Sequence, residues 1–156
     1  MQQAQTDPTI TGNVYAYDGT GITSENTVTV NSGKISGTVY GARSNAVTYN
    51  TLTVNGGTID QGIYGGYATG FVGNNTITLN GGTVSGDVYA GYSTGDSVDG
   101  NTINLYRTNV SGASLYGGGG NSVDNNTLNV YTLGNSVANI GNFQNINFYI
   151  PEDAKT

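Results

Sequence analysis

Three aspartates lie in two loops that are one repeat apart and could form a chemical site together. Asp96 and Asp99 belong to the first loop, which contains Ser97-Val98-Asp99-Gly100-Asn101, and Asp124 belongs to the matching segment Ser122-Val123-Asp124-Asn125-Asn126. If the two segments stack, Asp99 and Asp124 come within about 5 Å of each other. Carboxylates at that distance share a proton or bind a cation such as Ca²⁺ through their oxygens. The alternative is two solvated loop carboxylates that point apart.

A tyrosine recurs after an aliphatic residue once in every repeat, and this series is a candidate binding surface. Placed on one face of a repeat structure, the rings could bind sugars through CH–π contacts or anchor a protein partner. The alternative is a ladder of rings that only covers the protein. A small residue follows each ring and is expected to make room for it. The series comprises Tyr15, Tyr40, Tyr64, Tyr89 and Tyr116, of which the last four are the candidate ligand contacts.

A Thr-x-Thr pattern recurs at a similar interval, at 27–29, 51–53 and 76–78. Flat threonine arrays of this kind are typical of ice-binding solenoids, whereas the alternative is the β-propensity of threonine on a solvated face. The spacing between repeats is not constant along the chain, and this drift argues against an ice-binding plane.

Composition excludes several functional classes. The 156 residues include no Cys, His or Trp, which excludes thiol catalysis, imidazole chemistry and the usual zinc sites. The formal net charge of −6 argues against a nucleic-acid partner. Polysaccharide-active enzymes need clustered carboxylates, but no Lys or Arg recurs here to stabilise a developing sugar charge. We therefore expect a protein that is not an enzyme and that has no cofactor.

Internal repeats predict the fold. A second marker, Asn-Thr followed by alternating apolar and polar residues, begins at Asn26, Asn50, Asn75, Asn101 and Asn126. The alternation is typical of a strand with one buried face, and Asn-Gly-Gly segments supply the bends between strands. We expect an all-β protein, a parallel β-helix (β-solenoid) of about five to six coils of roughly 25 residues, with three short strands per coil. The five asparagines would then form a ladder.

The repeat pattern divides the chain into three parts. Residues 1–11 are expected to be a disordered or capping N-terminal segment, 12–150 the β-helix, and 151–156 a tail or a truncated continuation. The heavier alternating segment 142–151 is either a plug for the open end of the rod or simply the next strand.

Residues 75–93, Asn-Thr-Ile-Thr-Leu-Asn-Gly-Gly-Thr-Val-Ser-Gly-Asp-Val-Tyr-Ala-Gly-Tyr-Ser, resemble the passenger-domain repeat of bacterial autotransporter adhesins (type V secretion). Residues 143–151 resemble the end of such a repeat block, and the likeness covers roughly residues 12 to 151. The resemblance implies a right-handed parallel β-helix displayed on the bacterial cell surface or released from it. It also implies attachment to the outer membrane through a C-terminal barrel that these 156 residues do not include.

The expected function is cell adhesion or self-association through one face of the β-helix. Its partner would be a glycan or protein of the host-cell surface, or another copy of the chain. The first alternative is a purely structural stalk that projects another binding domain. The second is a polysaccharide-active β-helix enzyme.

Overall fold

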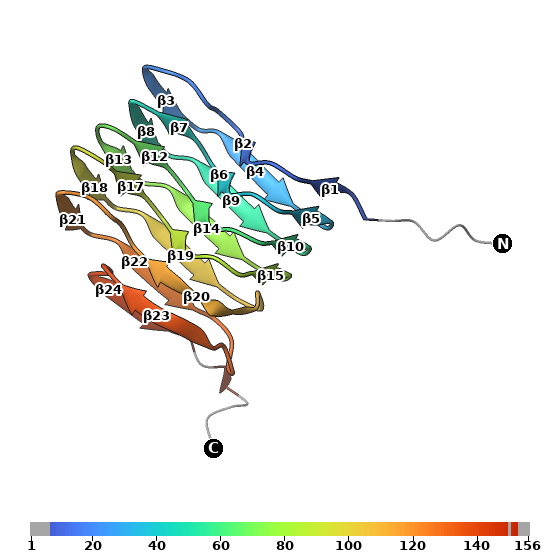
Figure 1. Cartoon of the computed structure of the whole chain (residues 1–156). Helices are drawn as coiled ribbons and strands as arrows, with labels where there is room; N and C mark the ends of the chain where they lie inside the picture. The colour runs from blue at the N-terminus through green and yellow to red at the C-terminus, as the bar shows by residue number, and fades with distance from the viewer. Residues whose placement is uncertain (1–6, 150, 153–156) are drawn as a thin grey trace.

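The computed structural model describes residues 7–149 and 151–152 and is a rod of stacked coils (Figure 1). The described part of the chain contains no α-helix, and every pair of neighbouring strands is parallel. Each strand pairs with strands one repeat before and after it, so successive coils lie on top of one another. The prediction of a parallel β-solenoid is therefore confirmed.

The longest strands form a six-stranded sheet, here called sheet E, whose register is unbroken. Threonine or asparagine occupies every outward position, and an aliphatic residue or phenylalanine occupies every inward position, as the period-2 pattern predicts. The strands of sheet E are β4 (Thr27–Val30), β9 (Thr51–Val54), β14 (Thr76–Leu79), β19 (Thr102–Leu105), β22 (Thr127–Val130) and β24 (Asn145–Phe148).

Two further sheets follow sheet E along each coil. Sheet A contains β1 (Thr9–Ile10), β5 (Lys34–Ile35), β10 (Thr58–Ile59) and β15 (Thr83–Val84). Sheet B carries the tyrosine series and contains β2 (Val14–Tyr15), β6 (Val39–Tyr40), β11 (Ile63–Tyr64), β16 (Val88–Tyr89), β20 (Val110–Tyr116) and β23 (Val137–Gly141).

Two more sheets complete the coil, so a full coil has up to five short strands rather than the predicted three. Their strands are two or three residues long and often include or adjoin glycine, so they carry no alternating pattern that a sequence would reveal. Sheet C contains β7 (Arg43–Ser44), β12 (Tyr67–Ala68) and β17 (Tyr92–Ser93). Sheet D contains β3 (Ile22–Ser24), β8 (Ala46–Thr48), β13 (Val72–Gly73), β18 (Ser97–Asp99) and β21 (Ser122–Asp124).

The rod has two hydrophobic cores. The larger core lies between sheets A, B and E and contains aliphatic side chains from every coil, such as Leu52, Ile63 and Ile77, all fully buried. The smaller core lies between sheets C and D, and its buried members are Ala42, Val47, Ala68, Val72 and Val98.

An asparagine ladder runs along the rod where sheet D turns into sheet E. The side-chain oxygen of Asn75 accepts hydrogen bonds from the backbone N–H and the amide of Asn50, at 3.0 and 2.7 Å. Asn75 in turn donates its backbone N–H and its amide to the side-chain oxygen of Asn101, at 2.9 and 2.8 Å. The predicted ladder is thus confirmed, and it satisfies polar groups that are completely buried at Asn75 and Asn101.

The residue before each ladder asparagine has a positive φ angle. Gly100 occupies this corner in one coil, whereas Glu25, Tyr49, Asn74 and Asn125 occupy it in the others. Residues other than Gly and Asn adopt a positive φ angle only with backbone strain, so Glu25 and Tyr49 are the strained members of the series.

Differences in coil length are absorbed outside sheet E. The step from Ala68 to its partner Ser93 is one residue shorter than the step from Val72 to its partner Val98, so the extra residue lies between Ser93 and Val98. The irregularity in β20 holds two residues more than β23 does, because Val110 and Ser114 are four positions apart while their partners Val137 and Asn139 are two apart.

The last coil is shorter than the others, and it brings Asn145 directly beside Thr127. The chain passes from β23 in sheet B to β24 in sheet E through the segment 142–144, without strands in sheets C and D. Gln144 replaces the ladder asparagine: its side-chain oxygen accepts from the backbone N–H of Asn126 at 2.9 Å, and its amide donates to the carbonyl of Val123. Of the two alternatives for the segment 142–151, its described residues thus support a further strand, because the side chains of β24 are exposed and Gln144 ends the ladder.

The N-terminal end of the solenoid begins earlier than residue 12. β1 lies within the segment 1–11 and pairs with β5 in register, while residues 1–6 lie outside the described residues. A cavity of about 170 Å³ opens at this end, lined by Ile10, Val14, Val28 and Val30 among others, because no earlier coil among the described residues covers the larger core.

Candidate functional site

The predicted tyrosine series forms one continuous column on sheet B. Consecutive ring centroids are 4.7, 5.2, 5.2 and 4.7 Å apart, and neighbouring rings are within 18° of parallel. Each ring is half-buried, so the column lies at the surface of the rod. The column comprises Tyr15, Tyr40, Tyr64, Tyr89 and Tyr116.

A second column, which was not predicted, stands beside the first on sheet C. The rings of Tyr67 and Tyr92 stack at 5.4 Å and 6°. They meet the rings of Tyr64 and Tyr89 edge to face, at 5.3 to 5.8 Å and 87° to 90°. The sequence signal for this column is a Gly-Tyr pair, which stands at 66–67 in one repeat and at 91–92 in the next. We call the seven rings of the two columns the tyrosine corner.

The strand spacing explains this herringbone arrangement. Stacked rings touch at about 3.5 Å, but their centroids are 5.2 Å apart at Tyr64, so each ring must tilt by about 45° to close the gap. Two columns tilted in opposite senses then meet near a right angle, as Tyr64 and Tyr67 do at 88°. As a consequence, both faces of an inner ring such as Tyr64 carry a neighbouring ring, and its outward surface is the ring edge and the hydroxyl.

The environment of the corner favours protonated phenols. Partial burial, followed by the neighbouring phenols of Tyr40 and Tyr89, raises the pKa of Tyr64 to about 12 from its usual 10.0. Burial is also the largest cause that raises the pKa of Tyr40 and of Tyr89. The inner rings of the corner therefore present neutral hydroxyl groups to any partner across the physiological pH range.

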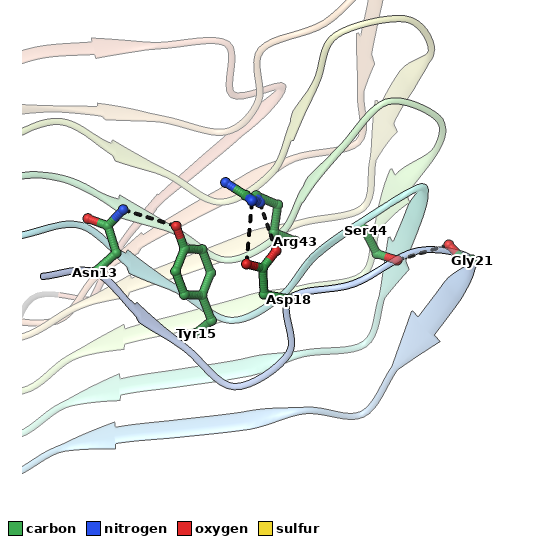
Figure 2. A network of polar contacts seen from close by, with 6 residues as sticks. All are labelled: Asn13, Tyr15, Asp18, Gly21, Arg43 and Ser44. Carbon is green, nitrogen blue, oxygen red and sulfur yellow. Dashed lines mark hydrogen bonds and ion pairs between the residues drawn. The ribbon is translucent and has the colours of Figure 1, made fainter.

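Charged and polar groups gather at the N-terminal end of the corner (Figure 2). The Arg43 guanidinium lies 5.2 Å from the ring centroid of Tyr15 and forms an ion pair with Asp18, with Nε 2.9 Å from Oδ1. Asn13 donates a hydrogen bond to the Tyr15 hydroxyl at 3.0 Å. The end ring of the column is thereby held by a cation on its face and an amide at its hydroxyl.

The small residues that follow the tyrosines have a different role from the one expected. A Cβ atom on Gly41 would lie 2.2 Å from the carbonyl oxygen of Gly65, and one on Gly65 would lie 2.3 Å from that of Ala90. In both cases the Cβ would also lie 3.3 Å from the Cβ of the ladder asparagine of the same coil. The expectation that these residues make room for the rings is therefore wrong for Gly41 and Gly65, which are instead restricted by the backbone of the next coil, whereas Ala90 carries a Cβ at the same repeat position.

The three candidate aspartates are placed as the repeat predicts, but each has a local hydrogen-bond donor. Asp99 and Asp124 are paired residues on neighbouring strands. Asp99 accepts from the Asn125 amide at 2.9 Å, Asp124 from the Ser122 hydroxyl at 2.8 Å, and Asp96 from the backbone N–H of Ser97 at 2.7 Å. Among the described residues, no group of three or more potential metal ligands of the His, Cys, Asp and Glu type is found.

The outward face of sheet E is an uncharged array. Thr27, Thr51, Thr76, Thr102 and Thr127 form one column along the first five strands. The second column changes from threonine to Asn104, Asn129 and Asn147, whose amides bond to the preceding member of the column. The drift in repeat length does not disturb this sheet, so the argument that it spoils a regular plane is wrong. The Thr-x-Thr pattern itself is limited to the first three strands.

A third tyrosine column stands at the far edge of sheet E, near the C-terminus. Tyr106, Tyr131 and Tyr149 directly follow β19, β22 and β24, and their ring centroids are 4.4 and 4.6 Å apart, with interplanar angles of 5° and 8°. In earlier coils the same position holds the hydrogen-bonded amides of Asn31, Asn55 and Asn80. We call these three rings the C-terminal tyrosine file.

Comparison with known proteins adds no relative. No family model, no curated protein and no solved structure matches the chain. Within the described residues, no helix has the length and apolar character needed to cross a membrane.

Proposed function

We propose that this chain is an adhesive β-solenoid displayed on the bacterial cell surface or released from it, and that it contacts its partner through the tyrosine corner. The observation that carries the proposal is the corner itself: seven half-buried rings form one continuous surface on a rod in which only 9% of residues are charged. Tyrosine is enriched at the centres of protein interfaces because it combines apolar area with a hydroxyl and loses little entropy on binding.

The geometry of the rings favours a protein partner over a sugar. CH–π binding of a sugar needs an uncovered ring face, whereas both faces of Tyr40, Tyr64 and Tyr89 lie against other rings. Ring edges and hydroxyls are the groups that remain available, and they suit the carbonyl groups and side chains of a protein surface. The partner in this proposal is therefore a protein of a host cell or a second copy of this chain, and a surface glycan is the alternative that the experiment separates.

A structural stalk is the second candidate, and the same geometry favours it. Stacking across five coils stabilises the rod whether or not a ligand binds, since each ring packs against its neighbours. In that case the solenoid would project another binding domain and would itself contact nothing. The outward hydroxyls of the corner would then be bonded only to water.

The test compares two pairs of stacked rings. Beads coated with the chain are added to cultured epithelial cells, to bacteria and to a glycan array, and sedimentation velocity measures self-association. Replacing Tyr67 and Tyr92 with Ala removes the second column of the tyrosine corner. Replacing Tyr106 and Tyr131 with Ala, as the control, removes two stacked rings of the C-terminal tyrosine file.

We expect the corner variant to lose at least tenfold in adherence, because the loss of even one central tyrosine costs roughly 2 kcal/mol. The control variant should adhere like the unmodified chain, and circular dichroism should show both to be folded. Equal losses in the two variants would refute the corner as the binding surface. A chain that binds no cell, no glycan and no second copy would support the stalk.

A further inference from the structure

The last ring of the C-terminal tyrosine file is more exposed and has fewer ring neighbours than the inner rings of the tyrosine corner. Tyr149 follows the last strand of sheet E and is 50% exposed. Tyr131 covers one of its faces at 4.6 Å, and among the described residues no other ring contacts it. Tyr64, in contrast, lies between two parallel rings and two perpendicular ones.

The chain offers an oxidant few targets other than tyrosine. It has no Cys, Trp or His, and its single Met is the first residue. A phenol that loses one electron and one proton becomes a phenoxyl radical, whose unpaired electron is shared with the ring carbons next to the hydroxyl. Two such radicals at van der Waals distance can join through those carbons.

We propose that Tyr131 and Tyr149 are a site of oxidative cross-linking, in which hydrogen peroxide, used by a haem peroxidase, joins the two rings. Each phenol gives up one hydrogen atom, and a carbon–carbon bond forms between the two ortho carbons. The protons on those carbons then move to the oxygens and restore both hydroxyls. The net change is the loss of two hydrogen atoms from the protein, which reduce one peroxide molecule to two molecules of water.

The exposure of Tyr149 favours this pair over the stacked pairs of the tyrosine corner. Coupling requires one ring to swing from face-to-face stacking until its edge meets that of its neighbour. Tyr149 can do so because its outer side is exposed, whereas the rings at Tyr64 and Tyr89 are held by neighbours at 5.2 to 5.8 Å on several sides. The tyrosine corner is therefore expected to resist the reaction under the same conditions.

The cross-link would join the short last coil covalently to the coil before it. In the sequence, β23 and β24 both lie between residues 131 and 149. These two strands are the last of their sheets, and no described coil stacks on them. Terminal repeats are where a solenoid begins to open. A covalent bond there has the role that a disulfide would have in a chain containing cysteine.

The experiment treats the 156-residue chain with peroxidase and one equivalent of peroxide. We expect a monomer that has lost two hydrogen atoms by intact mass spectrometry, and dityrosine fluorescence. Chymotrypsin cleaves after Leu133 and Phe143, which separate the two tyrosines in the sequence, so a digest should yield peptides joined between residues 131 and 149. The oxidised monomer should unfold at a higher urea concentration than the untreated chain.

Tyrosine-to-phenylalanine variants serve as matched controls, because they keep the ring and remove the phenol. Tyr149→Phe should abolish the joined peptides, while Tyr49→Phe, at a 60% exposed residue outside the stacked columns, should leave their yield unchanged. The proposal is overturned if the bond maps to Tyr49 or to the tyrosine corner, if only linked dimers form, or if no hydrogen is lost.

Discussion

The asparagine ladder predicts that equivalent residues in different coils differ sharply in their contribution to stability. Replacing Asn75 with Ala removes the acceptor of two buried donors, the backbone N–H and the amide of Asn50. A buried donor left without a partner costs about 1–3 kcal/mol, so the two together cost about 4 kcal/mol. That loss is a large part of the roughly 5–15 kcal/mol that stabilises a typical domain.

Asn26 is the matched control, because it begins the ladder. It donates to Asn50, but no described residue donates to its side-chain oxygen, and it is only half-buried. Asn26→Ala therefore leaves no buried N–H without an acceptor and should cost about 1 kcal/mol. The expected difference between the two variants is about 3 kcal/mol.

Urea unfolding followed by circular dichroism measures this difference. With a slope of about 2 kcal/mol per molar urea, the unfolding midpoint of Asn75→Ala should lie about 1.5 M below that of Asn26→Ala. Equal midpoints for the two variants would refute the reasoning, because the substitutions are chemically identical and differ in the buried donors they leave behind and in the burial of the site.

Three further predictions concern single residues. Tyr49→Asn should raise the free energy of unfolding by about 1 kcal/mol in urea titrations, because Tyr49 has φ 56° and Asn tolerates this conformation at the equivalent corner residues Asn74 and Asn125; an unchanged or lower value would contradict the strain argument. Because the folded-state pKa of Tyr64 is raised to about 12 from 10.0, its contribution to stability should be fully present below pH 10 and should be lost between about pH 10 and 12. Urea unfolding over this pH range should therefore show a smaller fall for Tyr64→Phe, and an identical pH profile for the variant would contradict the prediction. Lys34→Met should cost less than about 1 kcal/mol, since its ion pair with Asp60 at 2.8 Å is half-exposed, and a larger loss in thermal or urea unfolding would show that the pair is stronger than its exposure suggests.

The sequence predicts the parts of the fold in which one residue type recurs at one place in every coil. The ladder asparagines and the alternating strands of sheet E are of this kind, because stacking aligns residues that share a repeat position. The tyrosine column on sheet B follows for the same reason.

Sheet C and most of sheet D are not predictable in this way; the matching Ser-Val-Asp segments of β18 and β21 are the exception. The strands of these two sheets are two or three residues long, too short to show a period, and some partners in neighbouring coils differ in type, as Tyr67 and Arg43 do. The second column of the tyrosine corner was missed for this reason, since Arg43 and Gly119 occupy the positions before and after Tyr67 and Tyr92. The role of the glycines after the tyrosines depends on the backbone of the neighbouring coil, which no local pattern reveals.

The direction of the hydrogen bonds in this rod determines how it responds to a pulling force. All sheets are parallel and join one coil to the next, so their backbone hydrogen bonds run along the long axis, in the direction of a load applied between the two ends. Such a load breaks the backbone hydrogen bonds between one pair of coils at a time, instead of breaking those of all coils at once. Each coil of roughly 25 residues then releases about 85 Å of extended chain. Under tension the molecule lengthens in steps and dissipates energy at each one.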